Sequence, residues 1–425
     1  MPSRRECFVY LQMPGSLEVV TCGRYALDHG RGGSMVGRFV YGQRYRTRRD
    51  AVPLDPYHLP ISAGVRETAR LGGVFGALRD AAPDAWGRRV IERILGRPGL
   101  DEVDFLLESP QDRAGALSFG RGPEPPGPVH EYNRVVHLAD LRRGAALLEE
   151  DRPGRAVPAQ VLDLLEPGTS LGGARPKNVV EDEAGLWIAK FPQRGDRWNN
   201  APVEAAMLAL AGRCGIRVPE TRVERVGAES VLLVKRFDRE RLADKGGKAG
   251  YLRHRMVSAL TVLDAEESPT DRAGWSYVLL ADELRRWSSR PRADRAELFR
   301  RVVFNALISN VDDHPRNHAL IAPGRAWQLA PAYDLTPNPR QGQDDRRLAM
   351  ECGSFGRVAR RDNLLSQAAR FGLREREANA VIDGMKEVVG RFWRHEALRH
   401  GASERDCEVI EPAFLYPGFE YATET

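Results

Sequence analysis

The stretch Asn310-Val-Asp-Asp-His-Pro-Arg-Asn317 decides how this chain is interpreted. Asp312 and Asn317 lie five residues apart, so one loop can offer a carboxylate to a hydroxyl proton and an amide oxygen to a divalent ion, as phosphotransfer requires. The residues that follow predict two short strands, which end at a second aspartate, Asp334. Asp and Asn also stabilise turns that have no catalytic role. The loop alone therefore leaves a catalytic and a structural role equally open.

The sequence before the loop favours catalysis. Apolar residues recur at helical spacing over residues 297–309, which predicts an amphipathic helix that ends at the loop. Pro315 prevents this helix from continuing through His314, because proline has no backbone donor and clashes with the preceding turn.

A lysine and a glutamate farther upstream complete a phosphotransfer pattern. Residues 185–190 predict an apolar strand that contains Lys190, and a buried lysine needs a partner. Residues 202–214 predict a helix with Glu204 near its start. Each residue alone is more typical of a solvated surface charge. Their order relative to Asp312 makes them candidates for the lysine–glutamate pair of kinases.

A loop of small residues, 169–177, precedes a predicted strand at 178–180. Glycines such as Gly172 and Gly173 let backbone donors approach phosphate oxygens, and Lys177 adds positive charge. A Gly-Gly pair alone is more typical of a turn. Only six of the 64 basic residues are lysines, so a lysine in this loop suggests a need for a compact ammonium group.

A strand predicted at 230–234 continues into Lys235 and Phe237. This segment would join a small nucleotide-binding lobe to a large helical lobe, and adenine would bond to its backbone. A strand end with solvated charges is the alternative.

Together these motifs resemble those of HipA-type serine/threonine kinases, the toxins of HipBA toxin–antitoxin modules. The kinase motifs that match are Ser170–Lys177, Trp187–Pro192, Arg236–Arg239, Asp312–Asn317 and Tyr333-Asp334. The N-terminal third is similar to the family's N-terminal domain at Gly37–Tyr41, Pro60–Ser62, Phe75–Asp80, Pro83–Gly87, Asp104–Leu107 and Gly115–Leu117.

The resemblance implies a role for each site residue. Asp312 would be the catalytic base, and His314 would accompany it in the catalytic loop. Asn317 and Asp334 would hold magnesium, while Lys190 would bind the phosphates of ATP. The adjacent Asp313 leaves open which of the two acids faces the substrate.

The resemblance also implies regulation and partners. Ser170 would be autophosphorylated, with Thr169 as the neighbouring alternative, and the phosphate loop would then be expelled. A small helix-turn-helix antitoxin of HipB type would bind the chain and read DNA, so this chain would contact DNA mainly indirectly. The protein substrate would be an aminoacyl-tRNA synthetase, whose phosphorylation would halt translation and growth.

The expected fold is α+β: a bilobal protein-kinase-like fold with a small β-rich lobe, a large helical lobe and a fused N-terminal α/β domain. The proline-rich stretch 121–128 predicts a linker. We expect the N-terminal domain at 1–125, the small lobe with the phosphate loop at 126–237 and the helical lobe at 238–425.

Composition agrees with a globular cytoplasmic protein. The chain has 425 residues, 42% of them hydrophobic, and no run approaches the roughly 20 apolar residues that span a membrane. Its net charge of +5 comes mostly from dispersed arginines. Two other functions remain open: a small-molecule phosphotransferase of antibiotic-kinase type, and a non-catalytic co-repressor that acts with an antitoxin.

Overall fold

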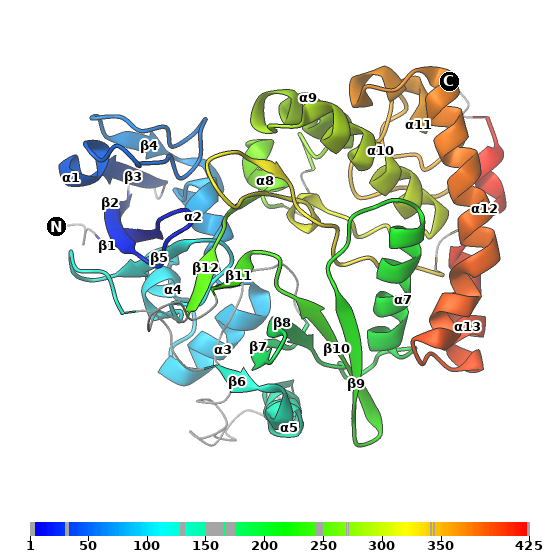
Figure 1. Cartoon of the computed structure of the whole chain (residues 1–425), viewed down its shortest axis with the longest axis horizontal. Helices are drawn as coiled ribbons and strands as arrows, with labels where there is room; N and C mark the ends of the chain where they lie inside the picture. Colours follow the sequence, from blue (N-terminus) through cyan, green and yellow to red (C-terminus); the bar gives the residue numbers. More distant parts are fainter. Residues whose placement is uncertain are drawn as a thin grey trace. The chain divides into compact units, whose positions relative to one another are not determined.

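The computed structural model describes residues 5–29, 34–127, 132–149, 165, 175–242, 250–268, 270, 272–340, 342 and 345–422. They form two compact units (Figure 1). The first comprises Met1–Ala189, Arg236–Thr261 and Leu320–Trp327, and the second comprises the remaining segments. The chain passes between the units several times, so the domain limits expected at 125 and 237 stay a prediction. The helix expected at 156–165 lies almost entirely outside the described residues.

The first unit contains an antiparallel five-stranded sheet in the order β4-β3-β2-β1-β5. Tyr25 and Phe39 face each other across β2 and β3, and both are fully buried. Phe75 packs edge-on against both rings, so aromatic side chains fill the core on this face of the sheet. The strands are β1 (Arg5–Gln12), β2 (Val19–His29), β3 (Met35–Tyr41), β4 (Arg66–Thr68) and β5 (Leu117–Gly120).

Short helices and further strands complete the first unit. Helix α3 begins at Asp84, whose carboxylate accepts a hydrogen bond from the backbone N–H of Gly87, and it ends at Gly96 in a left-handed conformation. The helices are α1 (Gln43–Arg46), α2 (Gly76–Asp80), α3 (Ala85–Leu95), α4 (Glu102–Glu108), α5 (Leu138–Glu149) and α8 (Ala259–Val262). The strands are β6 (Asn133–Arg134), β7 (Lys177–Asp182), β8 (Gly185–Lys190), β11 (Arg239–Leu242), β12 (Gly250–Arg253), β13 (Arg255–Ser258) and β14 (Ala319–Ala322).

The second unit is mainly helical. Helix α10 was expected from Glu297 but begins at Pro291, because its first turns are polar and proline suits the first helical position. The helices are α7 (Asn200–Arg213), α9 (Tyr277–Trp287), α10 (Pro291–Leu307), α11 (Arg361–Ser366), α12 (Glu375–Arg399) and α13 (Glu404–Ile410). The strands are β9 (Thr221–Val226), β10 (Glu229–Lys235) and β15 (Gln328–Leu329). In the part of the chain that the structure describes, no helix has the length and apolar character needed to cross a membrane.

Two arginines and two aspartates form a buried cluster in the first unit. Asp112 accepts hydrogen bonds from Arg236 at 2.5 Å and from Arg239 at 2.8 Å. Asp238 accepts from the same two guanidinium groups, and also from the backbone N–H of Gly115 at 2.9 Å. Burial opposes ionisation, but the charge of Arg236 outweighs it and lowers the pKa of both carboxyls. Each charge is therefore stable only with its partners in place.

Replacement of Asp238 by asparagine should destabilise the protein. Asp238→Asn leaves two buried guanidinium groups without one of their carboxylates, so we expect a loss of about 3–5 kcal/mol in the free energy of unfolding. Urea unfolding measures it. The matched control is Asp140→Asn, at an exposed ion pair with Arg143, where the loss should stay below about 1 kcal/mol. Equal losses in the two variants would contradict the buried role of Asp238.

The buried cluster of Asp112 and Asp238 should also make the free energy of unfolding depend on pH. Because the pKa of Asp112 and of Asp238 is lowered on folding, their stabilising contribution is present above the unfolded pKa of about 3.9 and is lost as the pH falls below it. Urea unfolding between about pH 5 and pH 2 should show a steeper loss for the wild type than for Asp238→Asn, which lacks one of these carboxyls. Parallel curves would exclude Asp238 as a source of acid sensitivity.

Candidate functional site

The loop 308–318 leaves the end of α10 through a tight turn. Ser309 has a positive φ of 54°, and the backbone N–H of Asn310 donates to the carbonyl oxygen of Asn305 at 2.8 Å. The carbonyl oxygen of Asp312 accepts from the backbone N–H of His314 at 2.8 Å and from Nδ2 of Asn317 at 3.2 Å. The short 3-10 helix Pro315–Asn317 follows. These bonds fix Asp312, His314 and Asn317 in one compact turn.

Asp313 and Asp312 have opposite environments. Asp313 is buried, and its Oδ2 atom contacts the hydroxyl of Tyr277, Nδ2 of Asn305 and Nε2 of His318, each at 2.6 Å. Burial opposes its ionisation, but the contacts with His318 and Tyr277 prevail and lower the pKa of Asp313. Asp312 is exposed. Of the two acids, only Asp312 is exposed to solvent, and the role of Asp312 toward a substrate stays a prediction.

The ionisation of Asp312 is also affected by its surroundings. Its side chain reaches solvent, but neighbouring protein atoms partly desolvate it, and this raises its pKa. The negative charges of Asp313 and Asp334 act in the same direction, while His314 and Arg272 oppose them. A raised pKa suits a group that accepts a proton.

Lys190 lies between two carboxylates from distant parts of the sequence. Its Nζ atom contacts Oε1 of Glu204 at 2.6 Å and also contacts Oδ1 of Asp334. Burial opposes the positive charge, but the two acids prevail and raise the pKa of Lys190. The predicted lysine–glutamate pair is thus present as a contact, because the last residue of β8 faces the first turns of α7.

Asn317 and Asp334 have ligand atoms that suit magnesium. Nδ2 of Asn317 donates to the carbonyl oxygen of Asp312, so the ligand atom that Asn317 could offer a cation is its amide oxygen. The hydroxyl of Tyr333 donates to the carbonyl oxygen of Arg316 at 2.7 Å, which joins the two segments next to these ligands. Asp334 has a positive φ of 55°, which aspartate tolerates better than most residues. One carboxylate and one amide would leave positions for phosphate oxygens and water, as magnesium prefers.

Among the described residues, no group of three or more His, Cys, Asp and Glu side chains could hold a metal ion. A magnesium site at Asn317 and Asp334 would therefore depend on oxygen atoms of a bound phosphate.

The positions of the other predicted nucleotide contacts do not decide whether these residues bind a nucleotide. Lys177 is buried with its ammonium group against Asp84, so a phosphate would have to compete with that carboxylate. Lys235 pairs with Glu220 at 2.9 Å, and Phe237 is half-buried. Their roles stay predictions. Thr169, Ser170, Gly172 and Gly173 lie outside the described residues.

The hydrogen-bond partners of Asp313 were not predicted from the sequence. Tyr277 comes from α9, Asn305 from α10 and His318 from the end of the loop, and nothing in their spacing connects them. The adjacent second aspartate was the available signal, since two acids side by side rarely share one environment.

Two domain families and several known proteins are similar to this chain. The HipA N-terminal domain matches residues 23–120, and the HipA-like C-terminal domain matches residues 169–393. The putative kinase Y4mE of Sinorhizobium fredii is 26% identical over 379 residues, which are 83% of this chain and 86% of that protein. The putative kinase Y4dM of the same organism is 31% identical over 264 residues, 55% of this chain and 57% of that protein.

A solved structure has the same fold. A chain from the Shewanella oneidensis MR-1 toxin–antitoxin complex of HipA, HipB and operator DNA matches with a TM-score of 0.68 at 17% identity, over 96% of this chain and 94% of that chain. The match confirms the predicted fold class: a bilobal kinase-like α+β fold with a fused N-terminal domain.

The two neighbouring acids should respond differently to substitution. Asp313→Asn replaces a buried acceptor by an amide that cannot accept from all three donors, so it should cost about 2–4 kcal/mol in the free energy of unfolding. Asp312→Asn is the matched control, and it should change stability by less than about 0.5 kcal/mol. Urea unfolding of both variants measures the difference. A reversed order would show that Asp312 is the structural acid.

Proposed function

This chain belongs to the HipA family, and we propose that it is a serine/threonine protein kinase that depends on ATP and Mg²⁺ and acts as the toxin of a toxin–antitoxin module. Its substrate would be a protein hydroxyl, on an aminoacyl-tRNA synthetase, and Ser170 would be its autophosphorylation site.

The contact of Lys190 with Glu204 and Asp334 carries the proposal. It brings together a strand end, a helix start and the segment after β15, which are far apart in the sequence. The Lys190 side chain is only 17% exposed, so the two carboxylates stabilise a largely buried charge. A kinase needs a lysine held by a glutamate beside an acid that binds metal.

The proposed catalytic step uses these side chains in the roles that kinase chemistry requires. Asp312 would orient the substrate hydroxyl and accept its proton as the bond from the hydroxyl oxygen to the γ-phosphorus forms. The bond from that phosphorus to the oxygen of ADP would break. Lys190 would move from Asp334 to the ATP phosphates, while Asn317 and Asp334 would hold the metal. Magnesium, when bound, would neutralise charge on the phosphate oxygens.

The structural relative supports a partner of HipB type, because that protein was solved with HipB and operator DNA. We propose that a small helix-turn-helix antitoxin binds this chain and contacts DNA on its behalf.

Two other functions compete with the proposed protein kinase. A small-molecule phosphotransferase would share the Asp312 and Asn317 loop, but it would not require a HipA N-terminal domain. A non-catalytic co-repressor would tolerate loss of Asp312, whereas here that aspartate is accessible and Asp313 is the acid that supports the fold.

Incubation with ATP and Mg²⁺ followed by intact mass and phosphosite mapping tests the proposal. The wild type should gain phosphate on Ser170, while Asp312→Ala should lose at least about a hundredfold in rate, because general-base catalysis contributes on that scale. Asp345→Ala, which removes an exposed carboxylate of the second unit, is the control and should retain full activity.

The other outcomes separate the alternatives. Phosphate on Thr169 alone would place the autophosphorylation site one residue earlier, and the proposed kinase activity would stand. No phosphate on the protein, with ATP turned over in the presence of an aminoglycoside, would favour the small-molecule phosphotransferase. Toxicity in cells that survives Asp312→Ala would favour the co-repressor.

A further inference from the structure

A buried arginine joins the start of the loop 308–318 to two other segments of the second unit. Arg346 is 1% exposed, and its guanidinium group donates four hydrogen bonds. The acceptors are uncharged oxygen atoms from three parts of the chain: the carbonyl oxygen of Gly342 at 2.9 Å, Oγ of Ser309, the carbonyl oxygen of Ala413 at 3.1 Å and that of Pro412 at 2.7 Å. One side chain thus connects the residues that follow α10 with the segment after Asp334 and with the C-terminal segment 412–416.

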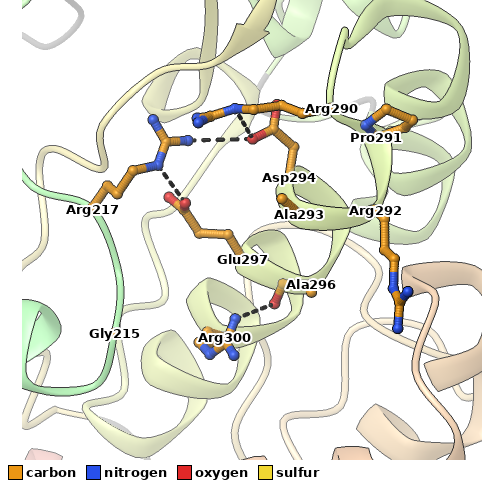
Figure 2. Close-up of a pocket in the computed structure, with 10 residues that line it drawn as sticks. All are labelled: Gly215, Arg217, Arg290, Pro291, Arg292, Ala293, Asp294, Ala296, Glu297 and Arg300. Atoms are coloured by element: carbon orange, nitrogen blue, oxygen red, sulfur yellow. Dashed lines mark hydrogen bonds and ion pairs between the residues drawn. The ribbon is translucent and has the colours of Figure 1, made fainter.

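Within the described residues, no acid pairs with this arginine. At the other end of α10 the arginines do have an acidic partner, since Arg217 and Arg290 both form ion pairs with Asp294 (Figure 2). The guanidinium of Arg346 has only its neutral acceptors and the ring of Tyr416, whose centroid is 4.4 Å away. A buried charge without a counter-ion is stable only while its acceptors stay in place. Arg346 therefore constrains the segments that supply those acceptors.

The C-terminal segment 412–416 also holds the end of α10 directly. The backbone N–H of Leu415 donates to the carbonyl oxygen of Leu307 at 2.9 Å, which satisfies an acceptor that a helix end leaves free. Oγ of Ser309 donates to the carbonyl oxygen of Ala413 at 2.6 Å. Ser309 and Leu415 have positive φ values of 54° and 47°, a conformation that residues other than glycine rarely adopt. These contacts hold both residues in that conformation.

The backbone of Arg346 is fixed by the same set of residues. The hydroxyl of Tyr416 donates to the carbonyl oxygen of Ala359 at 2.6 Å, and the N–H of Ala359 donates to the carbonyl oxygen of Arg346 at 2.8 Å. The ring that packs against the guanidinium is therefore tied to the neighbour of the arginine's own backbone. The positive charge also lies next to the C-terminal end of α10, where the helix dipole favours a cation.

We propose that Arg346 is a positioning residue for the loop that carries Asp312. Together with the C-terminal segment 412–416, it fixes Ser309 and so sets the direction in which the chain leaves α10. Asp312 follows Ser309 by three residues, so a change of direction at Ser309 displaces the acid. Lysine would not replace this arginine, because one compact ammonium group cannot reach acceptors on three segments as the planar guanidinium does.

Hydrogen–deuterium exchange of the full-length protein tests the position of the loop, whatever its activity. Ser309→Ala removes only the hydroxyl: the side chain keeps its Cβ, and Arg346 keeps its other acceptors. We expect the backbone amides of residues 310–318 to exchange at least about threefold faster than in the wild type, because a loop that has lost this anchor opens more often. Arg346→Lys should accelerate the same amides at least as much.

The control removes a serine hydroxyl with the same number of hydrogen bonds elsewhere in this unit. Oγ of Ser366 donates to the carbonyl oxygen of Asn363 at 2.6 Å and accepts from the N–H of Ser354 at 2.9 Å. Ser366→Ala should leave the exchange of residues 310–318 unchanged. Thermal unfolding verifies that each variant is folded at the temperature of the experiment. Unchanged exchange in Ser309→Ala, or equal acceleration in the two serine variants, would overturn the proposal.

The consequence for phosphotransfer rests on the proposed kinase function. Ser309→Ala should lower kcat about tenfold and leave KM for ATP within about twofold, because a displaced base slows the chemical step and leaves nucleotide binding intact. Ser366→Ala should change neither constant. A higher KM with an unchanged kcat in Ser309→Ala would contradict the positioning role.

The two measurements separate this proposal from the kinase proposal. A wild type that transfers no phosphate would refute the proposed kinase function, and the exchange experiment would still decide whether Arg346 and Ser309 hold the loop. An active wild type together with unchanged exchange in Ser309→Ala would refute the positioning role alone.

Discussion

The buried carboxylate of Asp313 is the constraint on which the candidate site depends. A charge with 1% exposure is stable only if donors surround it, and Tyr277, Asn305 and His318 provide them from two helices and the end of the loop. With Asp313 fixed inward, the next residue on its N-terminal side is directed to solvent. Two neighbouring aspartates thus differ in exposure: Asp313 is buried and holds the loop through its hydrogen bonds, and Asp312 is exposed.

The charges around Lys190 impose a second constraint on the site. One ammonium group faces two carboxylates, Glu204 and Asp334, so the group of three has an excess negative charge without a cation. In the proposed kinase, Asp334 would hold a divalent ion, and Lys190 would then keep Glu204 and be available to phosphate. Glu204 is the better anchor, because its side chain is 8% exposed against 22% for Asp334. This asymmetry suits a lysine that keeps one partner and exchanges the other.

Several secondary-structure elements could be predicted from the pattern of apolar residues, whereas the catalytic and binding roles of the site residues stay predictions. The strand at 185–190 has the predicted limits, since its apolar run is continuous. The start of α10 was missed by six residues, because 291–296 has little apolar periodicity. The partners of Asp313 could not be predicted, because three-dimensional contacts between distant polar residues leave no local pattern. The phosphate loop with Ser170 remains a prediction.

Helix α10 explains why hydrophobic periodicity gives an incomplete account of this fold. Asp294, Glu297, Arg301 and Asn305 follow one another at spacings of three and four residues, so they share one face of the helix, and all four are buried. Each makes a specific contact: Asp294 with the N–H of Leu329, Glu297 with Nε of Arg217, Arg301 with the carbonyl oxygen of Ala330, and Asn305 with Asp313. The stripe therefore positions the strand that precedes Asp334 and the loop that carries Asp312. An apolar face would pack as tightly, but it could not specify where these two polar segments lie.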